Sequence, residues 1–481
     1  MNGDRLNIIF YKYTILFIII NAFFVFHESL YFALIPLGVA IILLSFFSLD
    51  KVLLLIVFLV PFSVPLREFI PNLPVDFYLP TEPLMVGVLL VFIFKILYQR
   101  KFENRIIRHP VSIAIAANLI WILITSITST MPVVSLKFFT ARIWFVIAFY
   151  LLGTQLFKNF ENTKKFIWLY VVSFTAIIFY VLNRQYESGL FNQVAANYVV
   201  SPFYSDHTSY GAMLAMFIPV LLGFEFASEY SSQTKFLIFF VLLIFLVAFI
   251  FSYTRAAWIS FAGMIFIWLL IKFKLKLRTV LLIFTGLTTF FFIYKSEILI
   301  KLSLNKQDSS KNIEKHLESI ANVTTDASNL ERLNRWSCAI RMFNERPVFG
   351  WGPGTYMFKY APFQLSYEKT IISTNAADRG NAHSEYIGPL AESGALGMVT
   401  FIMILITTVY TALKVYLHSK KKEIKMLSLC LLLGLITYFI HGLLNNFLDT
   451  DKASVPFWGF IAIIVAMDVY HTSEEKNLNY K

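Results

Sequence analysis

The residue types best suited to chemistry gather between positions 328 and 397, in the longest polar stretch of the chain. This stretch holds one histidine, His383, and the arginine pair Arg332 and Arg335. Near pH 7 a neutral imidazole can take a proton from a hydroxyl group as that hydroxyl attacks another molecule. A guanidinium group presents a planar fork of donors that suits a phosphate. The combination predicts acid–base chemistry on an anionic substrate; the alternative is a structural histidine beside an ordinary solvated helix face.

A further arginine, Arg255, stands between two apolar runs, at the tip of a predicted hairpin of membrane helices. The ordinary explanation is an interfacial side chain that reaches the lipid headgroups. Outer ends of membrane helices are poor in cations, however, so a lone arginine there suggests a ligand. Together, Arg255, Arg332 and Arg335 could hold a diphosphate and stabilise it as a leaving group. Arg142 lies within an apolar run and needs a partner or a water-filled cavity.

Other ionisable residues are accessory candidates. Asp206 and His207 form a second acid–base pair, which a helix cap for the apolar run that follows explains equally well. Glu385 follows His383 by two residues and could assist it. His441 and Asp449 flank the last predicted outer loop, where ionisable groups in a membrane bundle are often functional.

The elements that must position these residues are membrane helices. The chain has 481 residues, of which 58% are hydrophobic and 15% charged, whereas soluble domains carry about 25% charged residues. The apolar runs are long enough to span a hydrocarbon core of about 30 Å, and the first is expected to be a retained helix, since no cleavage site follows it. The two cysteines, Cys338 and Cys430, exclude a disulfide framework and show no metal-ligand spacing. The sequence therefore predicts an all-α polytopic membrane protein without a metal site.

The net charge of +12 could suggest a nucleic-acid partner, but its distribution indicates membrane topology instead. If the N-terminus is cytoplasmic, the cytoplasmic loops and tails hold 23 lysines and arginines, and the short outer loops hold five. Such an asymmetry is typical of multi-pass membrane proteins. It predicts that both termini are cytoplasmic and that no nucleic acid is bound. The fourteen predicted spans lie near 9–27, 31–48, 52–68, 81–98, 111–129, 137–157, 166–183, 209–228, 236–253, 256–273, 279–297, 394–416, 426–443 and 455–470.

The longest outer loop carries most of the candidate residues. Loops of this length are usually functional or disordered, and this one has helix and turn signals that predict a fold. Ser328 and Glu331 have the spacing of a capping box, and Pro347 ends the helix that follows. A second helix is expected from His383 into the next span. One face of the first loop helix is apolar, with Leu330, Leu333, Trp336, Ile340 and Phe343.

The predicted domains are a membrane bundle at 1–297, the outer loop at 298–393, and C-terminal spans with a short tail at 394–481.

Three glycines follow Pro347 in a turn that lacks the lysine and the preceding strand of a phosphate-binding P-loop. We expect this turn to be rigid. No paired acidic motif for a metal-bound nucleotide sugar is present, which favours a lipid-linked donor. The order of residues here resembles the O-antigen ligase and polymerase superfamily: an arginine with a tryptophan four residues on, a Pro-x-x-Gly-x-Gly-x-Gly turn, a histidine and a Glu-x-Gly-x-x-Gly helix. The matching positions are Arg332, Trp336, Pro347, Gly350, Gly352, Gly354, His383, Glu392, Gly394 and Gly397, and Arg255 matches the other arginine of that family.

The resemblance implies a transferase of the bacterial inner membrane, with its active site on the periplasmic side and about twelve spans. The donor would be a glycan linked to undecaprenyl diphosphate. His383 would deprotonate an acceptor hydroxyl, the arginines would hold the diphosphate, and the anomeric centre would invert without metal or cofactor. The acceptor would be lipid A–core for a ligase, another lipid-linked repeat for a polymerase, or protein Ser or Thr for an oligosaccharyltransferase; the ligase is favoured. A different class, a flippase or transporter of lipid-linked glycans, would place its charged residues along a central cavity.

Overall fold

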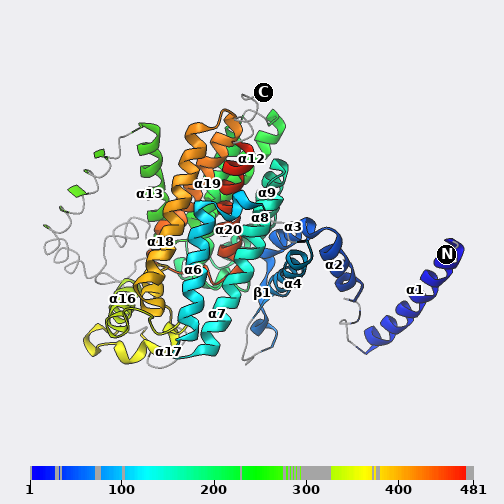
Figure 1. Cartoon of the computed structure of the whole chain (residues 1–481), viewed down its shortest axis with the longest axis horizontal. Coiled ribbons are helices and arrows are strands. Elements are labelled where there is room, and N and C mark those ends of the chain that lie inside the picture. Colours follow the sequence, from blue (N-terminus) through cyan, green and yellow to red (C-terminus); the bar gives the residue numbers. More distant parts are fainter. Residues whose placement is uncertain are drawn as a thin grey trace.

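The computed structural model describes residues 3–27, 32, 35–70, 77–99, 103–227, 230–274, 327–370, 373–374 and 380–472, with scattered positions between 278 and 293. Almost every described element is a helix (Figure 1). The exception is a two-stranded antiparallel ribbon that pairs β1 (Val64–Pro65) with β2 (Tyr78–Leu79). The predicted all-α polytopic membrane protein is confirmed.

Nine helices among the described residues are long and apolar enough to cross a membrane. Each coincides with one of the predicted spans, because a long apolar run both favours a helix and requires lipid or protein around it. They are α6 (Pro110–Ile127), α7 with η4 and α8 (Pro132–Leu156), α9 (Phe160–Glu187), α11 (His207–Glu225), α12 (Ser232–Phe251), α13 (Arg255–Lys272), α18 (Ile387–His418), α19 (Lys422–His441) and α20 with η7 (Asp451–His471).

The N-terminal helices differ most from the expectation. The predicted span at 52–68 is wrong as a single helix, since α3 (Leu49–Leu59) gives way to the 3-10 turn η2 (Val60–Phe62) and then to β1. Pro61 and Pro65 explain the break, because proline has no N–H for helix hydrogen bonds. The predicted span at 279–297 lies outside the continuously described residues. The other N-terminal elements are α1 (Gly3–Phe26), α2 (Ile35–Phe47), η3 (Leu66–Glu68), α4 (Thr81–Gln99) and α5 (Asn104–Ile107).

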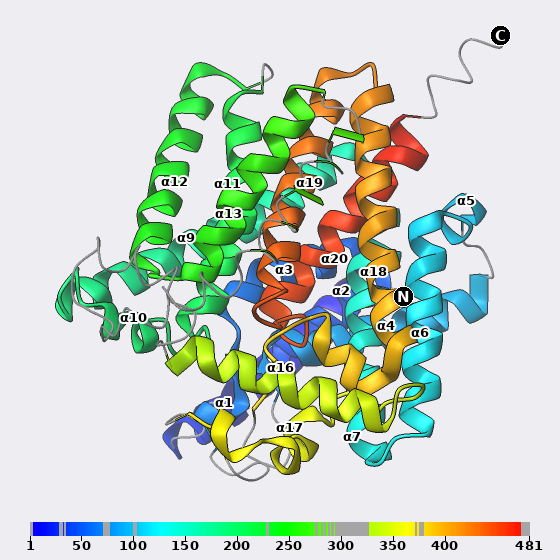
Figure 2. The ribbon, with the colours of Figure 1, turned by 90° about the vertical axis from the view of Figure 1, so that its left-hand side faces the viewer.

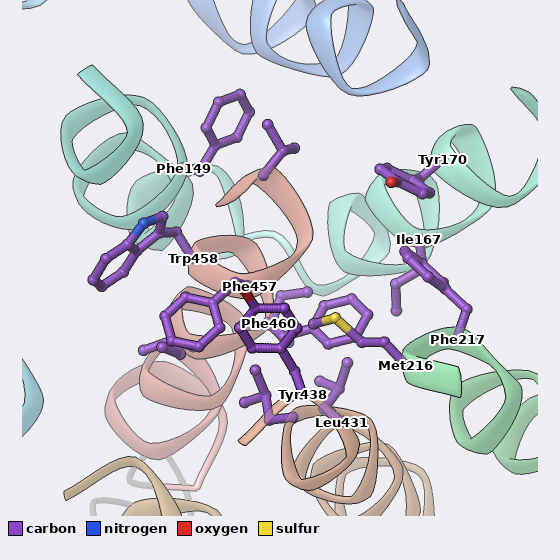
Figure 3. Packing of buried hydrophobic residues seen from close by; sticks show 14 of the residues in the cluster. Phe149, Ile167, Tyr170, Met216, Phe217, Leu431, Tyr438, Phe457, Trp458 and Phe460 are labelled. Carbon is purple, nitrogen blue, oxygen red and sulfur yellow. The ribbon is translucent and has the colours of Figure 1, made fainter. Parts of the chain in front are cut away.

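The centre of the bundle is formed by α20, α19 and α11, which are apolar on all sides and buried along most of their length. Figure 3 shows the aromatic packing that joins them to α9. The ring of Tyr170 stacks on Phe217 with centroids 4.6 Å apart, and Phe217 meets the edge of Phe460 at 5.3 Å. This core supports the helix ends that carry the candidate residues.

One end of the bundle, which we call the site face, carries the beginnings of α11, α13, α18 and α20 and the ends of α6, α9 and α19. Helix α16 (Ala327–Glu345) crosses this face (Figure 2). The opposite face holds ion pairs such as Lys414–Asp468 at 2.8 Å and Lys164–Glu423 at 2.6 Å. These are the helix ends that the charge asymmetry assigns to the periplasm, and they lie together in the structure. The orientation in the membrane stays a prediction.

Two predictions about the loop need correction, and one is confirmed. Ser328 lies inside α16, not at its cap, and the Glu331 carboxylate instead accepts a hydrogen bond from Thr370 at 2.9 Å. The second helix does not begin at His383; α18 begins at Ile387, and Gly394 interrupts it with φ 69°. As predicted, α16 ends at Glu345, just before Pro347. Short elements complete the fold: α10 (Gln193–Val199), α17 (Tyr356–Lys359), η5 (Ala361–Phe363) and η6 (Ser366–Glu368).

Candidate functional site

The two glycine motifs dock against each other, backbone to backbone. Gly352 N–H donates to the Glu392 carbonyl at 2.8 Å, and Ala395 N–H donates to the Pro347 carbonyl at 3.1 Å. Gly350 and Gly394 both have positive φ, 65° and 69°. A Cβ on Gly394 would lie 2.0 Å from the carbonyl oxygen of Val348, so only glycine allows this approach. The predicted glycine turn is therefore present, and it docks against α18 where Gly394 interrupts that helix.

Side chains from several elements complete this joint. The Glu392 carboxylate accepts a hydrogen bond from Tyr356 N–H at 2.9 Å. Ser135, near the start of α7, donates to the Pro353 carbonyl at 2.8 Å. Thr130, in the connection between α6 and α7, donates its N–H to the Trp351 carbonyl at 3.0 Å. The glycine turn is thus tied to three membrane helices.

His383 lies four residues before α18, in an irregular segment, and its own backbone is left-handed. Its φ is 48°, which is uncommon for a residue with a side chain. Its N–H donates to the Asn381 side chain at 3.1 Å, and Trp336 of α16 donates its indole N–H to the His383 carbonyl at 3.5 Å. Burial and the nearby cations Arg332 and Arg335 lower the pKa of His383 to about 4. The half-buried imidazole is therefore neutral near pH 7 and able to accept a proton.

Glu385 ties the histidine segment to the connection between α19 and α20. One carboxylate oxygen accepts hydrogen bonds from the Tyr438 hydroxyl at 2.7 Å and from the N–H groups of Phe447 and Leu448 at 2.8 and 2.9 Å. The N–H of Glu385 donates to the Gly442 carbonyl at 2.8 Å. A buried carboxylate with this many donors positions the backbone beside His383.

The two loop arginines have different surroundings. Arg332 is half-buried and donates through Nε to the Leu444 carbonyl at 3.2 Å, beside the same connection. Arg335 is buried: its Nε donates to Glu331 at 2.5 Å, its Nη2 donates to Thr374 at 3.1 Å, and its guanidinium lies 4.0 Å from the centre of the Tyr360 ring. Burial raises the pKa of Glu331, but hydrogen bonds from Ser373, Arg335 and Thr370 lower it overall, so this ion pair is charged.

Arg255 and Asp206 lie at neighbouring helix ends. Arg255 is the first residue of α13 and is half-buried. The preceding residue, Thr254, donates its hydroxyl to the His207 carbonyl at 2.8 Å. Asp206 is the N-cap of α11 and accepts a hydrogen bond from Ser209 N–H at 2.8 Å. The helix-cap explanation for Asp206 is thus confirmed. Because Asp206 also lies near the start of α13, its accessory role stays a prediction.

Electrostatic interactions show which of these groups the fold brings together. His383 interacts with Arg332, Arg335, Asp206 and Glu331. His441, at the end of α19, interacts with Arg332 and Asp206 and with the backbone of Ala256, next to Arg255. The sequence-predicted residues from α11, α13, α16 and the His383 segment therefore converge on one part of the site face.

Three residues of this region had no partner that could be predicted from the sequence. The imidazole of His441 lies 3.1 Å from the Asn445 amide, a residue that the spacing did not single out. Asp449 is exposed and interacts with Glu385 and Arg142. Arg142, whose partner was unknown, also interacts with Glu392. The pairs of Asp449 and Arg142 follow only from tertiary packing, because each joins residues more than fifty positions apart.

Comparison with known proteins agrees with this picture. A family model described as O-Antigen ligase matches residues 239–402, which include Arg255, Arg332, Arg335, His383 and Glu385 but not Asp206 or His207. A relative from Haemophilus influenzae, an uncharacterised protein, is 24% identical over 313 residues, which is 63% of this chain and 73% of that protein. The predicted resemblance is confirmed, and the match supports an O-antigen ligase- or polymerase-type membrane enzyme.

Proposed function

We propose that this O-antigen ligase-type membrane protein transfers a glycan from undecaprenyl diphosphate to an acceptor hydroxyl, with lipid A–core as the acceptor. The observation that carries the proposal is the His383 imidazole, whose pKa is lowered by burial and by the nearby Arg332, at a site face that also holds Arg255. A base beside fixed cations suits the attack of a hydroxyl on a sugar whose leaving group is a diphosphate.

In the proposed reaction His383 accepts the proton of the acceptor hydroxyl as its oxygen attacks the anomeric carbon. The bond between that carbon and the diphosphate oxygen breaks, with inversion at the carbon. Undecaprenyl diphosphate leaves with the electron pair, and Arg332 and Arg255 stabilise its growing negative charge. Guanidinium groups suit this role because they can donate two parallel hydrogen bonds to phosphate oxygens.

The other predicted residues act around this centre. Glu385 is a positioning residue, since its carboxylate holds the loop beside His383. Arg335 was predicted as a third diphosphate ligand; its ion pair with Glu331 makes it a support for α16, with a smaller part in binding. Asp206, whose charge raises the pKa of His383 against the effect of the arginines, and the adjacent His207 are accessory groups.

We place the chain in the inner membrane of a bacterium. In this proposal the site face is periplasmic and both termini are cytoplasmic. A cysteine introduced at the exposed Ser366 should react with a membrane-impermeant thiol reagent added to the periplasm. A cysteine at the exposed Lys421, on the opposite face, should be protected. Both native cysteines are buried and leave little background. The reverse pattern would refute the orientation and leave the chemistry open to test in vesicles.

Reconstitution tests the function itself. The purified chain in vesicles should transfer glycan from an undecaprenyl-diphosphate-linked donor to lipid A–core. Transfer to a second lipid-linked repeat would instead identify a polymerase, and transfer to a protein hydroxyl an oligosaccharyltransferase. Movement of the donor between leaflets without transfer to any of the three would refute the proposal and favour a flippase.

A further inference from the structure

Helix α16 buries charged and polar side chains and leaves two large aliphatic side chains exposed. Glu331, Asn334 and Arg335 are at most 4% exposed, whereas Leu333 and Ile340, two turns apart on the other side, are 39% and 47% exposed. The inner side also buries Cys338, Ala339 and Met342. An ordinary surface helix turns its large aliphatic side chains toward the core as well. Of the predicted apolar face, Leu333 and Ile340 are therefore turned away from the interior.

A network of polar contacts fixes this orientation. Asn334 donates to the Gln364 side chain at 3.0 Å, and Arg335 pairs with Glu331. Arg341 donates to the Phe363 carbonyl and to Glu368, each at 2.5 Å. Turning α16 to bury Leu333 and Ile340 would break these interactions, including the buried Arg335–Glu331 pair, and unpaired buried charges are strongly unfavourable. The apolar side must consequently face whatever surrounds the protein.

The turn after α16 continues this apolar edge to the surface of a membrane helix. Phe349 stacks on Trp121 of α6 with centroids 5.8 Å apart and planes 15° apart. Trp121 is six residues before the end of α6, so it lies about 9 Å below that end at the helical rise of 1.5 Å per residue. Its neighbours Ile120 and Ile124 are exposed and require lipid around them. Phe349 and the exposed Val348 thus lie beside a lipid-facing surface.

A cation accompanies the apolar edge. Arg346 is exposed and lies 4.5 Å from the centre of the Trp351 ring, just before Val348 and Phe349. Apolar and aromatic side chains flanked by arginine are typical of segments that lie in the membrane interface, where the cation meets lipid phosphates. Scattered apolar residues on a surface carry no such meaning; continuity with α6 and the neighbouring arginine distinguish this edge.

We propose that Leu333, Ile340, Val348 and Phe349 form a leaflet edge that inserts into the acyl chains of the lipid leaflet on the site face, with Arg346 at the phosphates. The partner is the phospholipid bilayer itself. The leaflet edge places α16, and with it Arg332 and His383, at the depth of lipid phosphate groups. This inference goes beyond the transfer reaction and depends on none of its steps.

Spin-label accessibility tests the insertion directly. Single cysteines replace Ile340 or Phe349 in the full chain, carry a nitroxide, and are reconstituted in vesicles of phosphatidylethanolamine and phosphatidylglycerol. Ser366→Cys is the matched control, because Ser366 is exposed in the same loop and polar. We expect the labels at 340 and 349 to collide more with oxygen than with a water-soluble nickel complex, and the label at 366 to do the reverse.

Two results would overturn the leaflet edge. One is nickel access at 340 and 349 equal to that at 366, which would place the edge in water. The other is protection of both positions from oxygen and nickel alike, which would mean that protein covers the edge. If either variant fails to fold, Leu333→Cys and Val348→Cys occupy the same edge and give the same readout. None of these measurements involves donor or acceptor, so they are separate from any test of transfer.

Discussion

The centre of the membrane bundle and the loop on the site face differ in the side chains that they bury. In the centre, α11, α19 and α20 bury apolar side chains such as Phe217 and Phe460. In the loop, α16 buries an ion pair and an amide beside Cys338, Ala339 and Met342, and it leaves Leu333 and Ile340 exposed. A hydrophobic pattern therefore predicts which side chains are buried in the first region but not in the second. In the loop, burial depends on the partners that each polar side chain finds.

The largest change in stability should come from the bundle centre. Phe460→Ala removes a fully buried ring between Phe217 and its neighbours, and such truncations cost about 3–5 kcal/mol. Transfer per folded molecule should be unchanged, since the ring is far from the site face. Unfolding in detergent measures the loss. The exposed Phe179→Ala is the control, expected within about 0.5 kcal/mol of the wild type. Equal effects of the two would contradict the packing described.

In the loop, a comparable loss of stability should follow from breaking an ion pair instead of removing a buried ring. Arg335→Ala leaves the Glu331 carboxylate buried without its partner, and breaking a buried pair in this way costs about 3–5 kcal/mol. Hydrogen exchange of the α16 amides should accelerate, while that of α20 should not. The double change Glu331→Gln with Arg335→Met removes both charges and should recover most of the protection. Normal protection in Arg335→Ala would show that polar packing does not hold α16.

Arg332 and Arg255 should affect the reaction and not the fold. Arg332→Ala and Arg255→Ala are each expected to lower transfer by about 10²–10³-fold, as for the loss of one charge-stabilising donor in a transition state. Lysine should restore only part of the rate, because a point charge cannot donate the paired hydrogen bonds of a guanidinium. Steady-state transfer with the lipid-linked donor measures both. A wild-type rate in Arg255→Ala would mean that this side chain only reaches toward headgroups.

The smallest effect on stability should come from the place where the two glycine motifs dock. Gly394→Ala forces a methyl group against the Val348 carbonyl at a positive φ, which should cost about 1–3 kcal/mol. Gly87→Ala in α4 meets nothing within 4 Å and should be neutral or stabilising by up to about 1 kcal/mol. Thermal unfolding of both variants compares them. If Gly394→Ala were as stable as Gly87→Ala, the backbone docking of the glycine motifs would not be required.

Much of this arrangement could be predicted from the sequence, because apolar runs and charge asymmetry are local signals. Nine described spans match predicted ones, and the glycine turn and the end of α16 are where proline and glycine place them. The break after α3 could also be found from Pro61 and Pro65, but hydropathy averaged over a window conceals it. Helix starts were less predictable: His383 is separated from α18 by a short segment held through Glu385, a tertiary contact.

The contacts of the site residues could not be predicted from the sequence, because they depend on tertiary packing. Periodicity gives the faces of α16 but not which face is inside, since that depends on Gln364, Glu368 and other residues of the loop. Arg335 has the spacing of a second phosphate ligand, and its burial against Glu331 and Tyr360 follows only from packing. The approach of His441 to Arg332 and Asp206 likewise joins three separate elements.

The central claim is that His383 is the general base of a transfer reaction. The most direct measurement is the rate of glycan transfer from the lipid-linked donor between acid and alkaline pH, for the wild type and for His383→Ala, with donor binding measured in parallel. Because the pKa of His383 is about 4, the wild-type rate should fall only as the pH drops toward 4, where the imidazole gains a proton. His383→Ala should bind donor normally, lack that acid limb, and transfer about 10²–10⁴-fold more slowly. Full activity of His383→Ala, or loss of folding or donor binding together with the rate, would contradict the account.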